Sequence, residues 1–280
     1  MSGEPGQPIN SVVFAPPFHA GGVKSLYAVC EWLSELGRCT IKTFRGPRLA
    51  DWFAHRCRLY DYSYVPDVLV YPEIHQPHFP GKTHVCYALG KRARVEPHAD
   101  LVVCKSRAIL DWVADDLPDA TTLLIEPSIK RAVFEYDGRP KQDLICYMTR
   151  PHKHPETARL LRDAYGEKVF EIVNLNETRV AEALRDAKVF VWRGDEREGS
   201  PRPPKEALVA GCVVVGLEQD LNERYHTDFG VRCSSVEELI VKAGEALRMP
   251  TPTAEERAVV RDSAEEKRDW HALFRCLGKL

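Results

Sequence analysis

The sequence lacks the features that mark membrane proteins and strongly charged proteins. No segment reaches the roughly 18 consecutive apolar residues that a membrane-spanning helix needs. The formal net charge is −2, which gives no global electrostatic reason to bind nucleic acid or an anionic membrane. Residues 1–10 are polar and do not have the basic-then-apolar layout of a secretion signal. We therefore expect a short disordered tail over residues 1–10 and a cytoplasmic protein.

The sequence also lacks patterns typical of disulfide frameworks and metal sites. Its nine cysteines include no C-x-x-C pair, and their number is odd. Several lie inside apolar runs, as in 101–104 and 212–215, which favours free, buried thiols in a reducing compartment. A zinc site needs clustered ligands, and the sequence shows neither such a cluster nor an Asp-x-Asp pair. We therefore expect no metal site.

What the sequence does contain is a regular alternation of short apolar runs and amphipathic stretches. The runs are nearly continuously apolar, which is typical of strands buried on both faces of a parallel sheet. The expected strands are 11–15, 40–44, 67–71, 84–88, 101–104, 122–125, 143–148, 169–173, 188–192 and 212–216. The expected helices between them are 23–36, 106–115, 154–165, 177–186, 204–210 and 236–247.

This alternation predicts the fold class. Strand–helix repetition implies right-handed βαβ units in a parallel sheet. The series restarts after the polar stretch 134–142, where we place a linker, and 280 residues suffice for two domains of about 130 residues each. We expect an α/β fold of two Rossmann-like, doubly wound parallel-sheet domains, 11–137 and 138–252. Their carboxyl strand ends would face a cleft, where such sheets bind ligands.

The last segment, 253–280, is expected to form one or two C-terminal helices. Thr253 is followed three residues later by Glu256, which is the spacing of a capping box. Trp270, Leu273 and Phe274 fall at helical spacing and predict one apolar stripe. We expect this tail to brace both domains.

A pair of glycines, Gly21 and Gly22, lies between the first expected strand and the first helix. Glycine lets backbone approach a ligand closely, and the N–H groups of a helix start favour anions. By itself such a pair is more often only a tight turn. The pattern is not G-x-G-x-x-G, and no acidic residue ends the second strand, which argues against an NAD-binding fingerprint.

Two cations, Arg150 and Lys153, follow the first strand of the second half. Arginine can bind two oxygens of a diphosphate at once, and lysine supplies a point charge. The alternative is a solvated loop with incidental charges.

Two carboxylates, Glu198 and Glu206, are separated by seven residues. Glu198 is expected on a loop, and Glu206 in the first turn of a helix that Pro203 and Pro204 begin and Gly211 ends. Carboxylates accept hydrogen bonds from paired hydroxyls, such as those of a sugar or a ribose. The alternative is two surface carboxylates around a proline turn.

This run resembles the E-x7-E region of retaining glycosyltransferases with the GT-B fold, in glycosyltransferase family 4. The family's usual form is E-G-x-G-x-P-x-x-E-A-x-A-x-G-x-P-V-V. Pro201 and Val213 stand where the family often has glycine and proline. The segments that match in order are Glu198-Gly199, Pro203, Glu206-Ala207, Ala210-Gly211, Gly21-Gly22-Val23, the Arg150/Lys153 loop, Ser106, Ile125-Glu126-Pro127 and Trp270, so the resemblance covers nearly the whole chain.

The resemblance implies transfer of a hexose or pentose from a nucleotide-sugar donor to an acceptor hydroxyl, with retention and without metal or cofactor. Glu206 would hold the donor ribose, and Glu198 the donor sugar. Arg150 and Lys153 would neutralise the departing diphosphate. The full set of implied donor-binding residues is Gly21, Gly22, Arg150, Lys153, Glu198, Gly199, Ser200 and Glu206.

The acceptor side is less defined. Glu73 and His75 end an expected strand, His19 lies beside the glycine pair, and any of them could orient or deprotonate an acceptor hydroxyl. With Glu198 they are the catalytic candidates, although each histidine also fits a surface loop. The acceptor stays open between glycan, lipid-linked glycan, small molecule and modified nucleic-acid base. Two alternatives remain: another Rossmann-type nucleotide-dependent enzyme, and a non-catalytic module that binds a nucleotide-sugar or a glycan.

Overall fold

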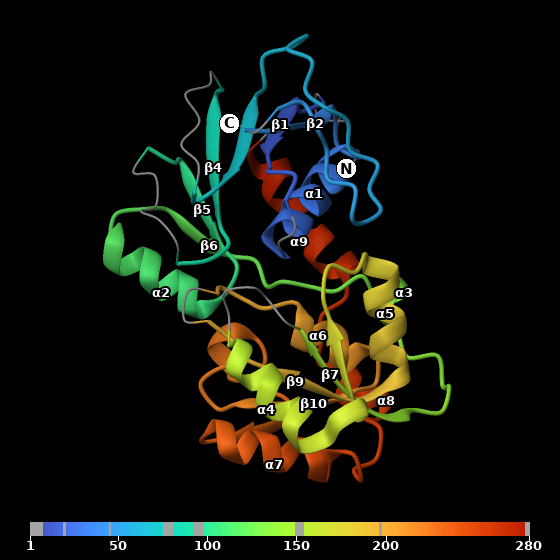
Figure 1. The fold of residues 1–280 in the computed structure, drawn as a ribbon. Coiled ribbons are helices and arrows are strands. Elements are labelled where there is room, and N and C mark those ends of the chain that lie inside the picture. The colour runs from blue at the N-terminus through green and yellow to red at the C-terminus, as the bar shows by residue number, and fades with distance from the viewer. Residues whose placement is uncertain are drawn as a thin grey trace. The chain divides into compact units, whose positions relative to one another are not determined.

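Two parallel β-sheets, each in its own unit, organise the chain (Figure 1). The computed structural model describes residues 8–18, 21–44, 46–74, 81–91, 98–148, 154–195 and 198–277. Unit 1 comprises Met1–Glu126 and Ala264–Leu280, and unit 2 comprises Pro127–Ser263. The chain therefore leaves unit 1, builds unit 2 and returns.

Unit 1 contains a six-stranded parallel sheet in the order β2-β1-β3-β4-β5-β6. Its strands are β1 (Ser11–Phe14), β2 (Cys39–Lys42), β3 (Val68–Pro72), β4 (Thr83–Ala88), β5 (Leu101–Cys104) and β6 (Thr122–Leu124). Its helices are α1 (Gly21–Leu33), α2 (Arg107–Asp116) and most of α9 (Ser263–Leu277).

Side chains of these strands alternate between two hydrophobic clusters. Val13, Val70 and Val103 pack in the cluster that contains α1 and α9. Their neighbours Val12 and Leu69 pack in the cluster that contains α2. Because successive side chains of a strand point to opposite faces, the two clusters cover the two faces of one sheet. This explains why the strands read as continuous apolar runs.

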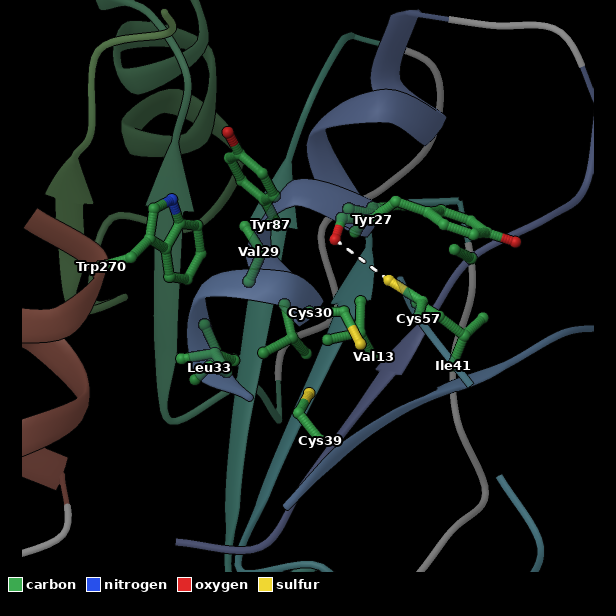
Figure 2. Packing of buried hydrophobic residues seen from close by; sticks show 14 of the residues in the cluster. Val13, Tyr27, Val29, Cys30, Leu33, Cys39, Ile41, Cys57, Tyr87 and Trp270 are labelled. Atoms are coloured by element: carbon green, nitrogen blue, oxygen red, sulfur yellow. Dashed lines mark hydrogen bonds between the residues drawn. The ribbon is translucent and has the colours of Figure 1, made fainter. Parts of the chain in front are cut away.

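Helix α9 completes the core of unit 1. Trp270 and Phe274 are fully buried, and the rings of Trp270 and Tyr87 lie 5.0 Å apart in an edge-to-face arrangement (Figure 2). The ring of His271 bonds the carbonyl oxygen of Trp32 at 2.8 Å, which fixes α9 beside α1. The predicted apolar stripe is confirmed, with Leu273 partly buried against the same cluster.

Unit 2 contains a five-stranded parallel sheet in the order β11-β10-β9-β7-β8. Its strands are β7 (Gln142–Met148), β8 (Val169–Ile172), β9 (Ala187–Trp192), β10 (Val213–Leu217) and β11 (Val231–Cys233). Its helices are α3 (Arg131–Phe134), α4 (Pro155–Tyr165), α5 (Glu177–Asp186), α6 (Pro203–Val209), α7 (Val236–Ala246) and α8 (Ala254–Ala258), with 3-10 turns η1 (Gly166–Lys168) and η2 (Glu223–Tyr225).

The sheet of unit 2 is doubly wound. From β7 the chain goes to β8 on one side and then to β9 on the other. Helices α4 and α7 pack in the cluster on one face, and α5 and α6 in the cluster on the opposite face (Figure 1). The expected pair of doubly wound, Rossmann-like parallel sheets is thus confirmed.

The predicted elements correspond to the observed ones, but the boundary between units does not. Each of the ten expected strands overlaps one of β1–β10, and the capping box of Thr253 and Glu256 is present at α8. The short elements α3 and β11 were not predicted. The expected linker over 134–142 lies inside unit 2. The Tyr136 amide donates to the carbonyl oxygen of Val209. The Lys141 ammonium donates to the carbonyl oxygens of Leu184 and Ala210. The division instead follows Glu126.

The cysteines of the chain are buried for the most part. All nine cysteines lie in the described part of the chain as free thiols, and all except Cys276 are buried, as the apolar runs around them predicted. None of the helices in the described ranges is long and apolar enough to span a bilayer. Those ranges also hold no group of three or more His, Cys, Asp or Glu side chains arranged to bind a metal ion.

Phe274→Ala should strongly destabilise unit 1. Removing a fully buried ring from the core leaves a cavity, with an expected loss of about 3–5 kcal/mol in the free energy of unfolding. Arg275→Ala, at an exposed position of the same helix, should stay within about 0.5 kcal/mol of the wild type. Urea unfolding followed by circular dichroism measures both; equal midpoints for the two variants would contradict this packing.

Candidate functional site

The sequence-predicted site residues that the structure describes lie at the carboxyl edges of the two sheets. Gly21, Gly22 and Glu73 belong to unit 1, and Glu198, Gly199, Ser200 and Glu206 belong to unit 2. His19, His75, Arg150 and Lys153 lie outside the described residues. Carboxyl edges are where doubly wound sheets bind ligands, so each group is described in turn.

The glycine pair forms the first turn of α1. A methyl group added to Gly22 would lie 3.1 Å from Cδ1 of Leu89, which follows β4. Glycine at this position therefore lets the helix start close against the end of the neighbouring strand. The N–H groups of a first helical turn have no partner within the helix, which leaves them oriented toward the carboxyl edge.

Glu73 directly follows β3 and is only 6% exposed. Its Oε2 accepts a hydrogen bond from the Leu89 amide at 2.9 Å, so it joins the ends of β3 and β4. Burial raises the pKa of this carboxyl, and the hydrogen bond from Leu89 and the charge of Lys105 oppose that shift. A raised pKa brings a carboxyl closer to the range in which it can exchange protons at neutral pH.

The loop that carries Glu198 is anchored to its surroundings on the N-terminal side of α6. The Glu198 amide donates to the Asp195 carbonyl at 2.8 Å, and the Glu198 side chain is half-buried. Ser200 is buried, and its Oγ donates to the Tyr225 carbonyl at 2.9 Å. These contacts hold the loop on unit 2 rather than leaving it as a solvated turn.

Lys205 was not among the predicted residues, yet it supports this loop. Its side chain is 2% exposed, and its Nζ donates to Ser200 Oγ at 2.7 Å. A buried ammonium is tolerated only where polar partners compensate for lost water. Sequence periodicity could not indicate this, because all seven residues of α6 are buried and the helix shows no polar face.

Glu206 lies in the first turn of α6 and is buried. Its Oε1 is 3.9 Å from Nε of Arg202, whose Nη2 donates to the Ser128 carbonyl at 3.0 Å. The two carboxylates of the E-x7-E pattern therefore differ in depth, with Glu198 on the loop and Glu206 inside.

A polar network that sequence reasoning missed joins three loops at the carboxyl edge of unit 2. His154 precedes α4, Arg193 and Gly194 follow β9, and Asp220 follows β10. The His154 ring bonds the Gly194 carbonyl at 2.9 Å and Nη2 of Arg193 at 3.1 Å. Arg193 Nη1 donates to Thr157 Oγ1 at 3.0 Å. The sequence did contain one indication of this network, because Arg193 is a charged residue directly after the predicted strand 188–192.

Asp220 completes this network. Burial raises the pKa of Asp220, and the negative charge of Glu198 adds to the increase. The Gly194 amide, which donates to this carboxylate, and the charge of Arg193 lower the pKa in opposition. The first carboxylate of the E-x7-E pattern thus contributes, as the smallest of these causes, to the electrostatic environment of Asp220.

The similarity of this chain to known proteins is found in solved structures. No protein-family model matches the chain, and no curated protein sequence matches it. The glycosyltransferase AviGT4, involved in avilamycin A biosynthesis, has a TM-score of 0.63 at 15% identity, over 97% of this chain and 98% of that chain. A sucrose-phosphate synthase from Thermosynechococcus elongatus has a TM-score of 0.67 at 13% identity, over 95% and 98%.

A third structure, HepE from Anabaena in complex with UDP-glucose, has a TM-score of 0.66 at 10% identity, over 95% of this chain and 100% of that chain. The chain has the GT-B fold. At these identities the similarity establishes the GT-B fold alone, and it extends over both units.

Glu73→Gln tests the environment of the buried carboxyl in unit 1. Because burial raises the pKa of Glu73 above its ordinary value of 4.5, the folded chain binds this proton more tightly than the unfolded chain. The contribution of Glu73 to stability therefore falls as pH rises from its pKa in the unfolded chain through its higher pKa in the folded chain. Glutamine keeps an acceptor oxygen for the Leu89 amide and does not titrate.

The Tm of Glu73→Gln relative to wild type should therefore increase between about pH 4 and about pH 7. Differential scanning calorimetry at the two pH values measures the change. A Tm difference that is independent of pH would contradict the raised pKa.

Proposed function

We propose that the chain is a glycosyltransferase that moves a sugar from a nucleotide-sugar donor to an acceptor hydroxyl. The observation that carries the proposal is the E-x7-E pattern, with Glu198 and Glu206 at the carboxyl edge of a doubly wound sheet in a GT-B fold. In a solvated proline turn these carboxylates would lie on the surface. Instead Glu206 is buried, and the loop between the two is fixed through Ser200 and Lys205.

The donor class is supported by what the structural neighbours bind. HepE is complexed with UDP-glucose in one structure and with UDP and glucose in another, and the pneumococcal O-GlcNAc transferase GtfA is complexed with UDP and GlcNAc. We propose a nucleoside diphosphate hexose or pentose as donor, and membership of glycosyltransferase family 4. The thiols buried in both units support a reducing, cytoplasmic compartment.

The proposed roles follow the depth of the donor-side residues. Buried Glu206 binds the ribose hydroxyls, while half-buried Glu198, with Gly199 and Ser200, contacts the donor sugar. Arg150 and Lys153 neutralise the diphosphate that leaves, so the cations come from the protein and no metal is required. Gly21 and Gly22 offer backbone N–H groups to phosphate, and the transfer proceeds with retention.

The acceptor side of the proposal lies in unit 1. Glu73, His75 and His19 are the groups proposed to orient or deprotonate the acceptor hydroxyl. Of these, Glu73 has the geometry of an orienting group, since it is held by the Leu89 amide at the end of β3. Its raised pKa suits a group that accepts a proton near neutral pH.

Donor turnover tests the proposal. Purified protein is incubated with UDP-, GDP-, ADP- and dTDP-sugars, with and without EDTA, and released nucleoside diphosphate is measured. Slow release with one donor, unaffected by EDTA, is the expected result. Binding without any release would favour a non-catalytic module, and failure to bind any of these donors would contradict the proposal.

Glu198→Gln and Glu206→Gln should have different kinetic effects. Glu206 is proposed to hold the ribose equally in the ground and transition states, so its loss should raise KM more than it lowers kcat. Glu198 is proposed to touch the sugar where charge develops, so Glu198→Gln should lower kcat by a factor on the order of ten to a thousand. Steady-state donor hydrolysis measures both parameters.

Glu182→Gln is the matched control for these two variants, because Glu182 is exposed on α5 of the same unit. It should retain the wild-type kcat and KM. Wild-type parameters for both Glu198→Gln and Glu206→Gln would remove the main support for a glycosyltransferase.

A further inference from the structure

The backbone of His154 adopts an unfavourable conformation beside the proposed donor loops. Its φ of 49° and ψ of 48° lie in the left-handed region, which residues with a Cβ rarely occupy. The following residue is Pro155, which further restricts the backbone of the residue before it. Such a conformation persists only where surrounding contacts enforce it, and it is often found at functional sites.

Contacts on both the backbone and the ring enforce this conformation. The His154 carbonyl accepts bonds from the Tyr147 hydroxyl at 3.2 Å and from the Thr157 amide at 3.1 Å. The ring Nε2 lies 2.9 Å from the Gly194 carbonyl oxygen, which can only accept, so Nε2 carries the proton. Ring Nδ1 lies 3.1 Å from Nη2 of Arg193, which can only donate, so Nδ1 accepts.

Together these two contacts need a hydrogen on Nε2 and an acceptor at Nδ1. Glu156 also approaches Nδ1, at 3.3 Å, but its side chain is half exposed and the contact is longer than that of Arg193. A protonated Nδ1 would direct a positive N–H at the Arg193 guanidinium. The tautomer with its hydrogen on Nε2 is the one that satisfies both Gly194 and Arg193.

The loop after β9 is held from its other side by Asp220. The side chains of Arg193 and Asp220 are 10% and 11% exposed, with Nε and Oδ2 3.9 Å apart. A methyl group at Gly194 would lie 2.5 Å from Asp220 Oδ1, so any larger residue there would displace the Asp220 carboxylate. In the sheet, β9 lies between β7 and β10. His154, which follows β7 in the chain, and Asp220, which follows β10, therefore contact the residues after β9 from opposite sides.

These contacts lie next to two segments that the proposed function assigns to the donor, one ending at Lys153 and the other carrying Glu198. Lys153, assigned to the diphosphate, directly precedes His154 in the chain. Gly194 leads into Asp195, whose carbonyl accepts from the Glu198 amide. We propose that His154 is a positioning residue that joins the start of α4 to Arg193 and Gly194 after β9 and thereby sets the donor-binding geometry. The proposal rests on the proposed function.

The experiment compares His154→Gly with Asn174→Gly. Glycine relieves the left-handed backbone at either position, and Asn174, with φ of 51°, is exposed after the edge strand β8. Isothermal titration with UDP, GDP, ADP and dTDP identifies the diphosphate that binds the wild type most tightly, and that ligand is used for all variants. His154→Gly should weaken its binding by about fivefold or more without lowering Tm, because the loops lose their alignment. Asn174→Gly should bind like the wild type.

Two further variants keep the result decisive. Asparagine accepts a left-handed backbone but does not reach the Gly194 carbonyl, so His154→Asn should also weaken binding, and it replaces the glycine variant should that variant not fold. The glutamine amide can donate to the Gly194 carbonyl and accept from Arg193, so His154→Gln should recover part of the affinity that His154→Gly loses.

The possible failures are distinguishable. Unchanged diphosphate affinity in a folded His154→Gly or His154→Asn protein overturns the positioning role and leaves the proposed function intact. A fall in affinity of equal size in Asn174→Gly also overturns it. A wild type that binds none of the four diphosphates contradicts the proposed function itself.

Discussion

Burial of both faces of a parallel sheet is the constraint on which the rest of this structure depends. Parallel strands must be joined by crossover connections, and those connections place helices on both faces. In unit 2, α4 and α7 cover one face and α5 and α6 the other. Each loop that follows a strand consequently emerges at the same edge, which brings His154, Arg193 and Asp220 together from distant parts of the sequence.

The same constraint explains why so many polar groups near these edges are buried. Glu73, Lys205 and Glu206 are each less than a tenth exposed. Burying such groups costs free energy unless hydrogen bonds or opposite charges compensate, and a paired buried charge seldom adds net stability. Their contribution is instead to fix loops: Glu73 holds the end of β4 through Leu89, and Lys205 holds Ser200 on the E-x7-E loop.

The residues proposed to bind the donor are thus held in place by contacts within unit 2. The half-buried Glu198 lies between two anchored stretches, Asp195 before it and Ser200 after it. The Gly194 amide donates to the Asp220 carboxylate, which fixes the residues that precede Asp195. Preorganised groups of this kind need little rearrangement when charge develops on a ligand, which suits the departure of a diphosphate.

The sequence by itself determined the strands, most helices and the fold class. Short, β-branched apolar runs such as Leu101–Cys104 favour strands buried on both faces, and the helices between them follow from their periodicity. It also determined the E-x7-E pattern, because Glu198 and Glu206 are close enough along the chain for their spacing to be informative. Short elements such as α3 and β11 carry too few residues to show a period.

Only the tertiary structure decided where the units divide and what supports the site. The polar stretch 134–142 has the composition of a linker, yet Lys141 caps the ends of two helices in unit 2. The apolar stripe of α9 predicted burial but not its partners, which are Tyr87 and α1 in unit 1. The contacts of His154 with Gly194 and Arg193 span about 40 positions in the chain. Such contacts leave no local pattern, because they depend on which strands become neighbours in the folded sheet.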